Sequence, residues 1–196
     1  MIERMCPKCR VPMNSEKCIN PNCDCTTVAS STIYWCNTCN IPIFERQCTC
    51  CGEEGEYITT DIRPVFPEEK LLLALLKGLE YNYYDEKSVW YGSNFYIVDG
   101  KKEKIVLSKI NNWTLSKIKE IKDEYDSKSG KIDYSFFESM IQRFVKANKE
   151  RYNYITEEAI TYIQSYKDRY NVEDMLVSFS GGKDSTVTSH IVNRAL

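Results

Sequence analysis

All ten cysteines of this 196-residue chain lie within its first 51 residues, where they form an internal repeat. The stretch CPKCRVPMNSEKC (6–18) aligns with CNTCNIPIFERQC (36–48) at an offset of 30 residues. Each half opens with C-x2-C and carries its third cysteine after eight further residues. A segment this short buries almost no apolar surface, so its fold depends on cross-links between the thiols or on metal ions that they bind.

Thiolates at this spacing are typical of tetrahedral metal sites, and zinc prefers such soft ligands. The sequence therefore predicts a double zinc ribbon over residues 1–55 that holds two zinc ions. We assign the ligands as two sets of four, namely Cys6, Cys9, Cys18 and Cys23, and then Cys36, Cys39, Cys48 and Cys51. The fourth ligand of each set stays open, because Cys25 can replace Cys23 and Cys50 can replace Cys51. An iron–sulfur cluster also takes four thiolates, and disulfides are the remaining alternative.

Nothing in the sequence suggests secretion or membrane insertion. The N-terminus, MIERMCPKC, has no apolar signal core. The longest apolar run, LLLALL (71–76), is far shorter than the roughly 20 residues that a spanning helix needs. The formal net charge of −2 excludes a global basic field for nucleic acid, although it is compatible with a local basic patch. We expect a cytoplasmic protein with no membrane partner.

Residues 60–112 read as a small α+β domain. Pro67 suits the first position of a helix, and Gly78 suits its end, so we expect a helix over 67–79. The aromatic and β-branched stretches SVWYG (88–92), NFYIV (94–98) and KIVL (104–107) predict strands, with a tight turn at Asp99-Gly100.

Residues 113–170 have a helical pattern throughout. We expect one helix near 114–126, a break at 127–131, and a second helix from about 134 to 150. Thr156 is predicted to cap a further helix that ends at Asn171, because Glu157 and Glu158 follow it in the first turn.

The stretch MLVSFSGGKDSTV (175–187) reads as a buried strand over 175–179, a glycine loop, and a helix from Asp184. Glycines let a backbone approach an anion closely, and the amides at a helix N-terminus point at it. Lys183 could neutralise phosphate charge, and Asp184 could cap the helix or help place Mg²⁺. The usual nucleoside-triphosphatase loop, G-x-x-x-x-G-K-[ST], differs from this one.

The string SFSGGKDSTV resembles the PP-loop of N-type ATP pyrophosphatases, S-G-G-x-D-S, and most closely that of the phosphoadenosine phosphosulfate reductase family. The resemblance implies a doubly wound α/β domain that binds an adenine nucleotide, either ATP or phosphoadenosine phosphosulfate. It implies that the nucleotide's phosphates are cradled by Ser180, Gly181, Gly182, Asp184 and Ser185. Lys183 stands at the variable position of the motif.

The upstream sequence is similar to archaeal-type members of this family, which carry zinc-ribbon and PUA-like segments before the reductase-like domain. The resemblance implies that RNA is a possible partner, because PUA-like domains usually bind it. The predicted fold class is therefore α+β and multi-domain, in four segments. They are the double zinc ribbon (1–55), a PUA-like domain (60–112), a helical segment (113–170) and the incomplete first βα unit of a PP-loop domain (171–196).

Only 11 residues follow Ser185, whereas a doubly wound domain needs well over 100 in total. We therefore expect a missing C-terminal segment or a partner chain. The family's reductases use a cysteine near the C-terminus, and this chain has none after Cys51, so no catalytic residue is assigned. His190, the only histidine, is expected to be a packed or surface residue.

Three functions follow from these patterns. The first is a phosphoadenosine phosphosulfate reductase-like protein that binds a nucleotide through the loop while a thiolate attacks the sulfur. The second is a PP-loop enzyme that adenylates RNA or DNA with ATP and then delivers sulfur. The third is a zinc-stabilised adaptor without catalysis.

Overall fold

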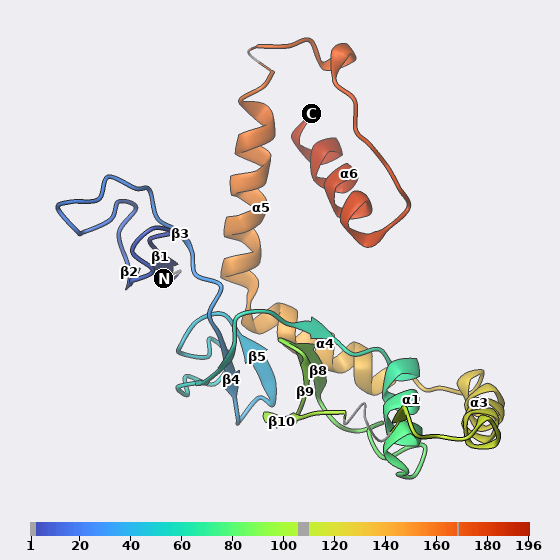
Figure 1. Ribbon diagram of the computed structural model, residues 1–196. Helices are drawn as coiled ribbons and strands as arrows, with labels where there is room; N and C mark the ends of the chain where they lie inside the picture. The colour runs from blue at the N-terminus through green and yellow to red at the C-terminus, as the bar shows by residue number, and fades with distance from the viewer. Residues whose placement is uncertain (1–2, 106–109, 168) are drawn as a thin grey trace. The chain divides into compact units, whose positions relative to one another are not determined.

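The computed structural model describes residues 3–105, 110–167 and 169–196, and it divides the chain into two compact units, 1–148 and 149–196. The first unit combines small antiparallel sheets with helices, and the second consists of helices and connecting segments (Figure 1). The α+β class predicted from the sequence is confirmed. No helix among the described residues is long and apolar enough to cross a membrane.

The cysteine repeat folds into two similar three-stranded sheets. The first has the order β2-β1-β3, formed by Arg4–Met5 (β1), Pro12–Met13 (β2) and Val28–Ala29 (β3). The second has the order β5-β4-β6, formed by Ile33–Cys36 (β4), Ile41–Ile43 (β5) and Glu56–Thr59 (β6). In each half the first two strands form a hairpin around the C-x2-C turn, and the third strand follows the last cysteine of that half.

A four-stranded antiparallel sheet follows in the order β10-β9-β8-β7. Its strands are Arg63–Pro64 (β7), Val89–Gly92 (β8), Phe95–Val98 (β9) and Lys101–Glu103 (β10). The turn at Asp99-Gly100 is confirmed, because both residues have positive φ and Lys101 pairs with Val98. The last strand begins three residues earlier than predicted, and Val106 and Leu107 lie outside the described residues.

Helix α1 (Pro67–Lys77) ends where the sequence indicates. Gly78 takes the left-handed conformation, and its N–H donates to the carbonyls of Ala74 and Leu75. Leu71, Leu73 and Leu75 of this helix are buried, whereas Leu72 is exposed. Helix α1 has packing partners on two sides: Leu73 joins the core beneath the four-stranded sheet, whereas Leu71 and Leu75 pack with Ile121 of helix α3 (Leu115–Ser129).

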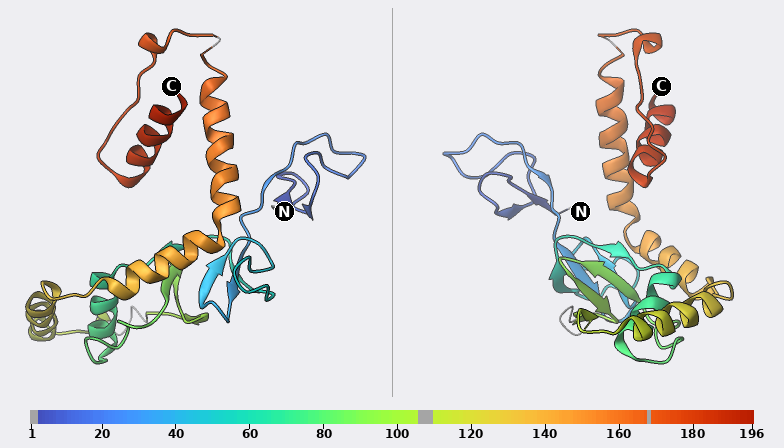
Figure 2. Two further views of the ribbon diagram at one scale, coloured as in Figure 1. Left: turned by 180° about the vertical axis from the view of Figure 1, so that it is seen from behind. Right: turned by 45° about the vertical axis from the view of Figure 1, so that its right-hand side comes forward.

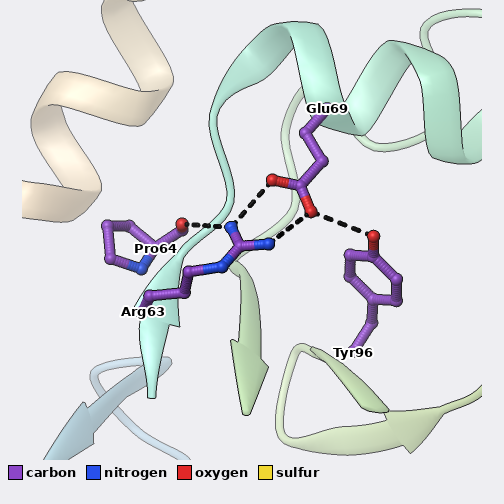
Figure 3. A network of polar contacts seen from close by, with 4 residues as sticks. All are labelled: Arg63, Pro64, Glu69 and Tyr96. Carbon is purple, nitrogen blue, oxygen red and sulfur yellow. Dashed lines mark hydrogen bonds and ion pairs between the residues drawn. The ribbon is translucent and has the colours of Figure 1, made fainter. Parts of the chain in front are cut away.

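A partly buried polar network ties the start of α1 to the four-stranded sheet (Figure 3). The guanidinium of Arg63 donates to both carboxylate oxygens of Glu69 at 2.8 Å, and Tyr96 Oη donates to the same carboxylate at 2.9 Å. Hydrogen bonds from Arg63 and Tyr96 lower the pKa of Glu69 although burial opposes them. The network fixes the entry of α1 against strands β7 and β9.

The largest core joins three segments that the sequence suggests are separate. Trp35 of β4, Trp90 of β8 and Met140 of helix α4 (Ser135–Ala147) are all fully buried in it. Phe144 of α4 lies 4.8 Å from the Trp90 ring, between ring centroids, and Figure 2 shows α4 running along this region. The second cysteine half, the four-stranded sheet and α4 therefore depend on one another for burial.

The helical segment is more continuous than predicted. Helix α3 spans Leu115–Ser129, capped by Thr114 as its side chain accepts from Lys117 N–H, and α4 spans Ser135–Ala147. Helix α5 spans Lys149–Gln164, so the predicted cap at Thr156 is wrong. Thr156 is buried in the middle of this helix, where the backbone N–H groups already have partners and a capping side chain has no role.

The predicted buried strand over 175–179 is also wrong. This segment follows a short 3₁₀ turn, η1 (Val172–Asp174), has no regular structure, and leads to α6 (Lys183–Ala195). Leu176 is 97% exposed and Phe179 is 62% exposed. Described residues of the second unit include no strand with which the segment could pair, and a strand needs such a neighbour to bury its backbone and side chains.

The fold leads to a prediction about Lys70, which is 1% exposed on α1. Its Nζ donates to the carbonyls of Lys87 at 2.7 Å and Asp85 at 3.4 Å. Burial lowers the pKa of Lys70 to about 8, and Asp85 and Asp99 oppose this shift only in part. The unfolded state therefore binds an extra proton between pH 8 and the usual lysine pKa near 10.5, so stability rises with pH in that window.

When the pH is raised from 7.5 to 9, we expect the free energy of unfolding of the wild type to increase by about 1 kcal/mol relative to that of Lys70→Met. Chemical denaturation at both pH values measures this difference. Lys119→Met, at an exposed position of α3, serves as the matched control and should show no such trend. A Lys70→Met difference that is constant with pH would show that the buried ammonium keeps its ordinary pKa.

Candidate metal centres and a candidate phosphate loop

The first cysteine half brings four thiols together. Cys6 Sγ lies 3.7 Å from Cys23 Sγ, and Cys18 Sγ lies 3.8 Å from Cys9 Sγ. The Cys9 amide donates to Cys6 Sγ at 3.3 Å, which orients the C-x2-C turn toward the cluster. We call this group the first thiol cluster.

The second half repeats this arrangement thirty residues later. Cys36 Sγ lies 3.4 Å from Cys51 Sγ, and Cys48 Sγ lies 3.8 Å from Cys39 Sγ. The Cys39 amide donates to Cys36 Sγ at 3.3 Å, as its counterpart does in the first half. We call this group the second thiol cluster.

The spacing of the thiols in each cluster fits one tetrahedrally coordinated metal ion per cluster. The four Sγ atoms of each lie within 4.8 Å of one another. An ion with bonds of about 2.3 Å to sulfur separates its thiolates by about 3.8 Å, close to the spacings in both clusters. Each cluster could therefore hold a metal ion such as zinc. The spacing alone left open whether Cys23 or Cys25, and whether Cys51 or Cys50, is the fourth ligand. The structure groups Cys23 and Cys51 with the other thiols.

The turns that bring these thiols together share a left-handed backbone conformation. Arg10 and Asn40, each directly after the second cysteine of its C-x2-C turn, both have positive φ, near 55°. This conformation reverses the chain, and the Arg10 amide donates to Cys6 carbonyl at 2.8 Å. Gly52 (φ 79°) closes the second cluster, with its amide donating to Cys48 carbonyl at 2.8 Å. The left-handed positions therefore bring cysteines distant in sequence to one point.

The environments of the two clusters differ. The Cys9 amide lowers the pKa of Cys6 to about 6, against the effect of burial. Burial raises the pKa of Cys36 to about 11, and a metal ion bound there would displace the thiol proton. Cys36 and Cys48 lie in the largest core, whereas the first cluster belongs to a small separate core with Met13 and Cys25.

The SGGKDS residues form an exposed loop at the start of α6. Gly181 has a φ of +77°, and Gly182 is the N-cap with extended backbone. The hydroxyls of Ser185 and Thr186 each donate to Gly182 carbonyl at 2.9 Å, and Ser180 donates to Ser185 at 3.2 Å. Lys183 and Asp184 are the first two residues of the helix. Of the six predicted residues, 180–182 therefore form the loop and 183–185 form the first turn of the helix, which begins one residue before the predicted start.

One cluster of exposed side chains was not found by sequence reasoning. Lys102 Nζ of β10 lies 4.5 Å from the ring centroid of Phe95 on β9 and 6.0 Å from that of Tyr57 on β6. Tyr57 is 62% exposed. These residues come from two different sheets, so no single strand pattern could reveal them. We call them the Lys102 cluster.

Comparison with known proteins gives no match, whether against family models, curated proteins or solved structures. A family assignment therefore rests on the residues alone and is a proposal.

We predict that the purified chain carries two metal ions and that Cys6→Ser and Cys36→Ser each lose one. Their structural effects should differ, because only the second cluster belongs to the largest core. Cys6→Ser should increase amide hydrogen exchange only in the first sheet, whereas Cys36→Ser should also lower the melting temperature of the rest of the first unit. Mass spectrometry of the metal content and hydrogen-exchange mapping measure these effects.

Cys25→Ser and Cys50→Ser are the matched controls for this experiment, and both should keep two ions. Loss of an ion in either control would mean that the bound protein uses that cysteine in place of Cys23 or Cys51.

Proposed function

We propose that this chain binds the phosphate groups of an adenine nucleotide or sulfonucleotide through residues 180–185, as a phosphoadenosine phosphosulfate reductase-like protein. The observation that carries the proposal is the exposed two-glycine loop at the N-terminus of α6. Its string SGGKDS is the motif that resembles the PP-loop, and the helix that follows it is one part of the strand–loop–helix context of that motif.

The loop's chemistry suits a phosphate. The first N–H groups of an α-helix have no partner inside the helix, so the amides from Lys183 to Ser185 are available to an anion. The helix dipole adds a favourable field at the same end. The ammonium of Lys183 can neutralise charge, and the Ser180 hydroxyl can donate once it turns from Ser185.

Asp184 has a separate role in this proposal. Its carboxylate lies in the first turn of α6, where it interacts favourably with the helix dipole. A carboxylate beside a polyphosphate also suits Mg²⁺, which binds oxygen ligands from both protein and phosphate. We propose that Asp184 serves the nucleotide through such an ion and does not contact phosphate oxygens directly.

We further propose that the two thiol clusters hold zinc as structural ions in a double zinc ribbon. The thiol spacings fit one ion per cluster. A four-iron cluster spreads its thiolates more widely, because each binds a different iron atom. The bound ions would supply folding free energy that the first sheet, with its small core, does not obtain from apolar burial.

The proposal predicts that the zinc-loaded chain binds phosphoadenosine phosphosulfate more tightly than ATP. Gly181→Ala should weaken binding of both by at least tenfold, because an alanine is strained at a φ of +77° and the loop changes shape. Isothermal titration calorimetry measures both affinities. Gly130→Ala, at a right-handed position that ends α3, is the matched control and should bind normally. Equal binding by Gly181→Ala would refute the role of the loop.

A second candidate function has one specific observation in its favour. The Lys102 cluster combines an exposed aromatic ring with a cation, as surfaces that stack bases and neutralise phosphates do. This favours the alternative in which the chain is part of a PP-loop enzyme that adenylates RNA or DNA and then delivers sulfur. The loop would then hold the phosphates of ATP.

This alternative predicts salt-dependent binding of single-stranded RNA by the full chain. Lys102→Glu should weaken binding at least fivefold at low salt, because it removes one phosphate-neutralising charge and introduces repulsion. Fluorescence anisotropy with labelled RNA at two salt concentrations provides the measurement. Lys119→Glu makes the same charge change on α3 and should have a much smaller effect. RNA binding that is equal in the two variants would contradict the assignment of this surface.

A further inference from the structure

The second unit contains a cavity beside the loop, lined by residues that the proposed phosphate site does not use. It has a volume of about 440 Å³ and lies between α5 and α6. Tyr152 and Ile155 line it from α5, and Val187, His190 and Ile191 line it from α6. These positions recur at intervals of three or four residues, so each helix presents one face to the cavity.

The cavity lies at the loop end of this helix pair. Helices α5 and α6 run in the same direction, as Figure 1 shows. Their C-terminal ends are tied together, because Gln164 Nε2 donates to Ala195 carbonyl at 3.4 Å and Lys167 Nζ donates to Leu196 carbonyl at 3.3 Å. The cavity is lined from Thr186 onward, one residue after the loop. Val187 lies only about 7 Å along the helix axis from Gly182.

We propose that this cavity holds the purine base and ribose of the nucleotide whose phosphates bind residues 180–185. This inference rests on the proposed function of the loop. The volume falls within the range of small-molecule sites, and the walls are mostly apolar with a few polar groups. A nucleotide needs this combination, because an apolar base and a charged phosphate lie a short distance apart.

The individual side chains suit a purine. Tyr152, 51% exposed, offers an aromatic face on which a base can stack. Ile155 and Val187 are also exposed, and a bound base would remove their apolar surface from water. His190 and Arg194 stand one helical turn apart on α6 and can donate hydrogen bonds to ring nitrogens or to the ribose. In this proposal His190 contributes to binding.

The test compares ATP with tripolyphosphate, which carries the phosphates without base or ribose. For the zinc-loaded full chain, calorimetry should show ATP binding at least tenfold more tightly than tripolyphosphate. Val187→Trp fills the cavity and should reduce ATP affinity to that of tripolyphosphate, while leaving tripolyphosphate binding unchanged. Thr188→Trp adds the same bulk at the next position, which does not line the cavity, and should alter neither affinity.

The outcomes separate this proposal from the one on which it rests. If ATP and tripolyphosphate bind equally, the base lies outside the cavity and the loop function stands. The same holds if both tryptophan variants bind ATP as wild type does, which would assign the cavity to packing with another polypeptide. If neither ligand binds wild type, the loop function and the cavity proposal both fail. Circular dichroism of the two variants shows whether each keeps its helices.

Discussion

The fold of the first unit depends on how Trp35 and the second thiol cluster are joined. Trp35 is fully buried in the largest core, and the next residue, Cys36, is one of the four thiols. Because β4 holds both, positioning the thiolates for a metal also positions the indole against the core. Gly100 shows how close this packing is: a Cβ atom there would lie 2.6 Å from Trp35 Nε1. Metal coordination and hydrophobic burial are therefore one structural constraint in this region.

Helix α4 extends that constraint along the chain. Asn148, at its C-terminal end, accepts a hydrogen bond from the Phe44 amide at 2.9 Å and donates to Pro42 carbonyl at 3.1 Å. Thr49 Oγ1 donates to Ala147 carbonyl at 2.8 Å beside the second thiol cluster. The Ala147 carbonyl, which lacks a partner inside the helix, is thus satisfied by Thr49 of the cysteine segment, and the Asn148 side chain joins the same segment to the end of α4. The second cysteine half therefore packs against the end of a helix that lies about a hundred residues later in the sequence.

Local chemistry could be predicted from the sequence, whereas long-range burial could not. The end of α1 at Gly78 and the turn at Asp99-Gly100 follow from the backbone preferences of single residues, and both are confirmed. The two thiol groups follow from spacing, because each repeat is short enough to close on itself. The prediction of a buried strand over 175–179 was wrong for the opposite reason. Its apolar composition suits a strand, but burial of a strand depends on neighbouring strands elsewhere in the chain. The core shared by Trp35, Trp90 and α4 was missed because no local pattern records which elements meet.

The two halves of the cysteine repeat also have unequal freedom to change. They share the spacing of their first three cysteines, the conformation of the C-x2-C turn and the grouping of four thiols. The second copy shares its core with the four-stranded sheet and α4, so its apolar positions must match surfaces outside the repeat. The first copy needs little beyond its own four thiols. An exchange of the two sequences would therefore remove a core residue, because the first copy has Met5 at the position where the second copy places Trp35.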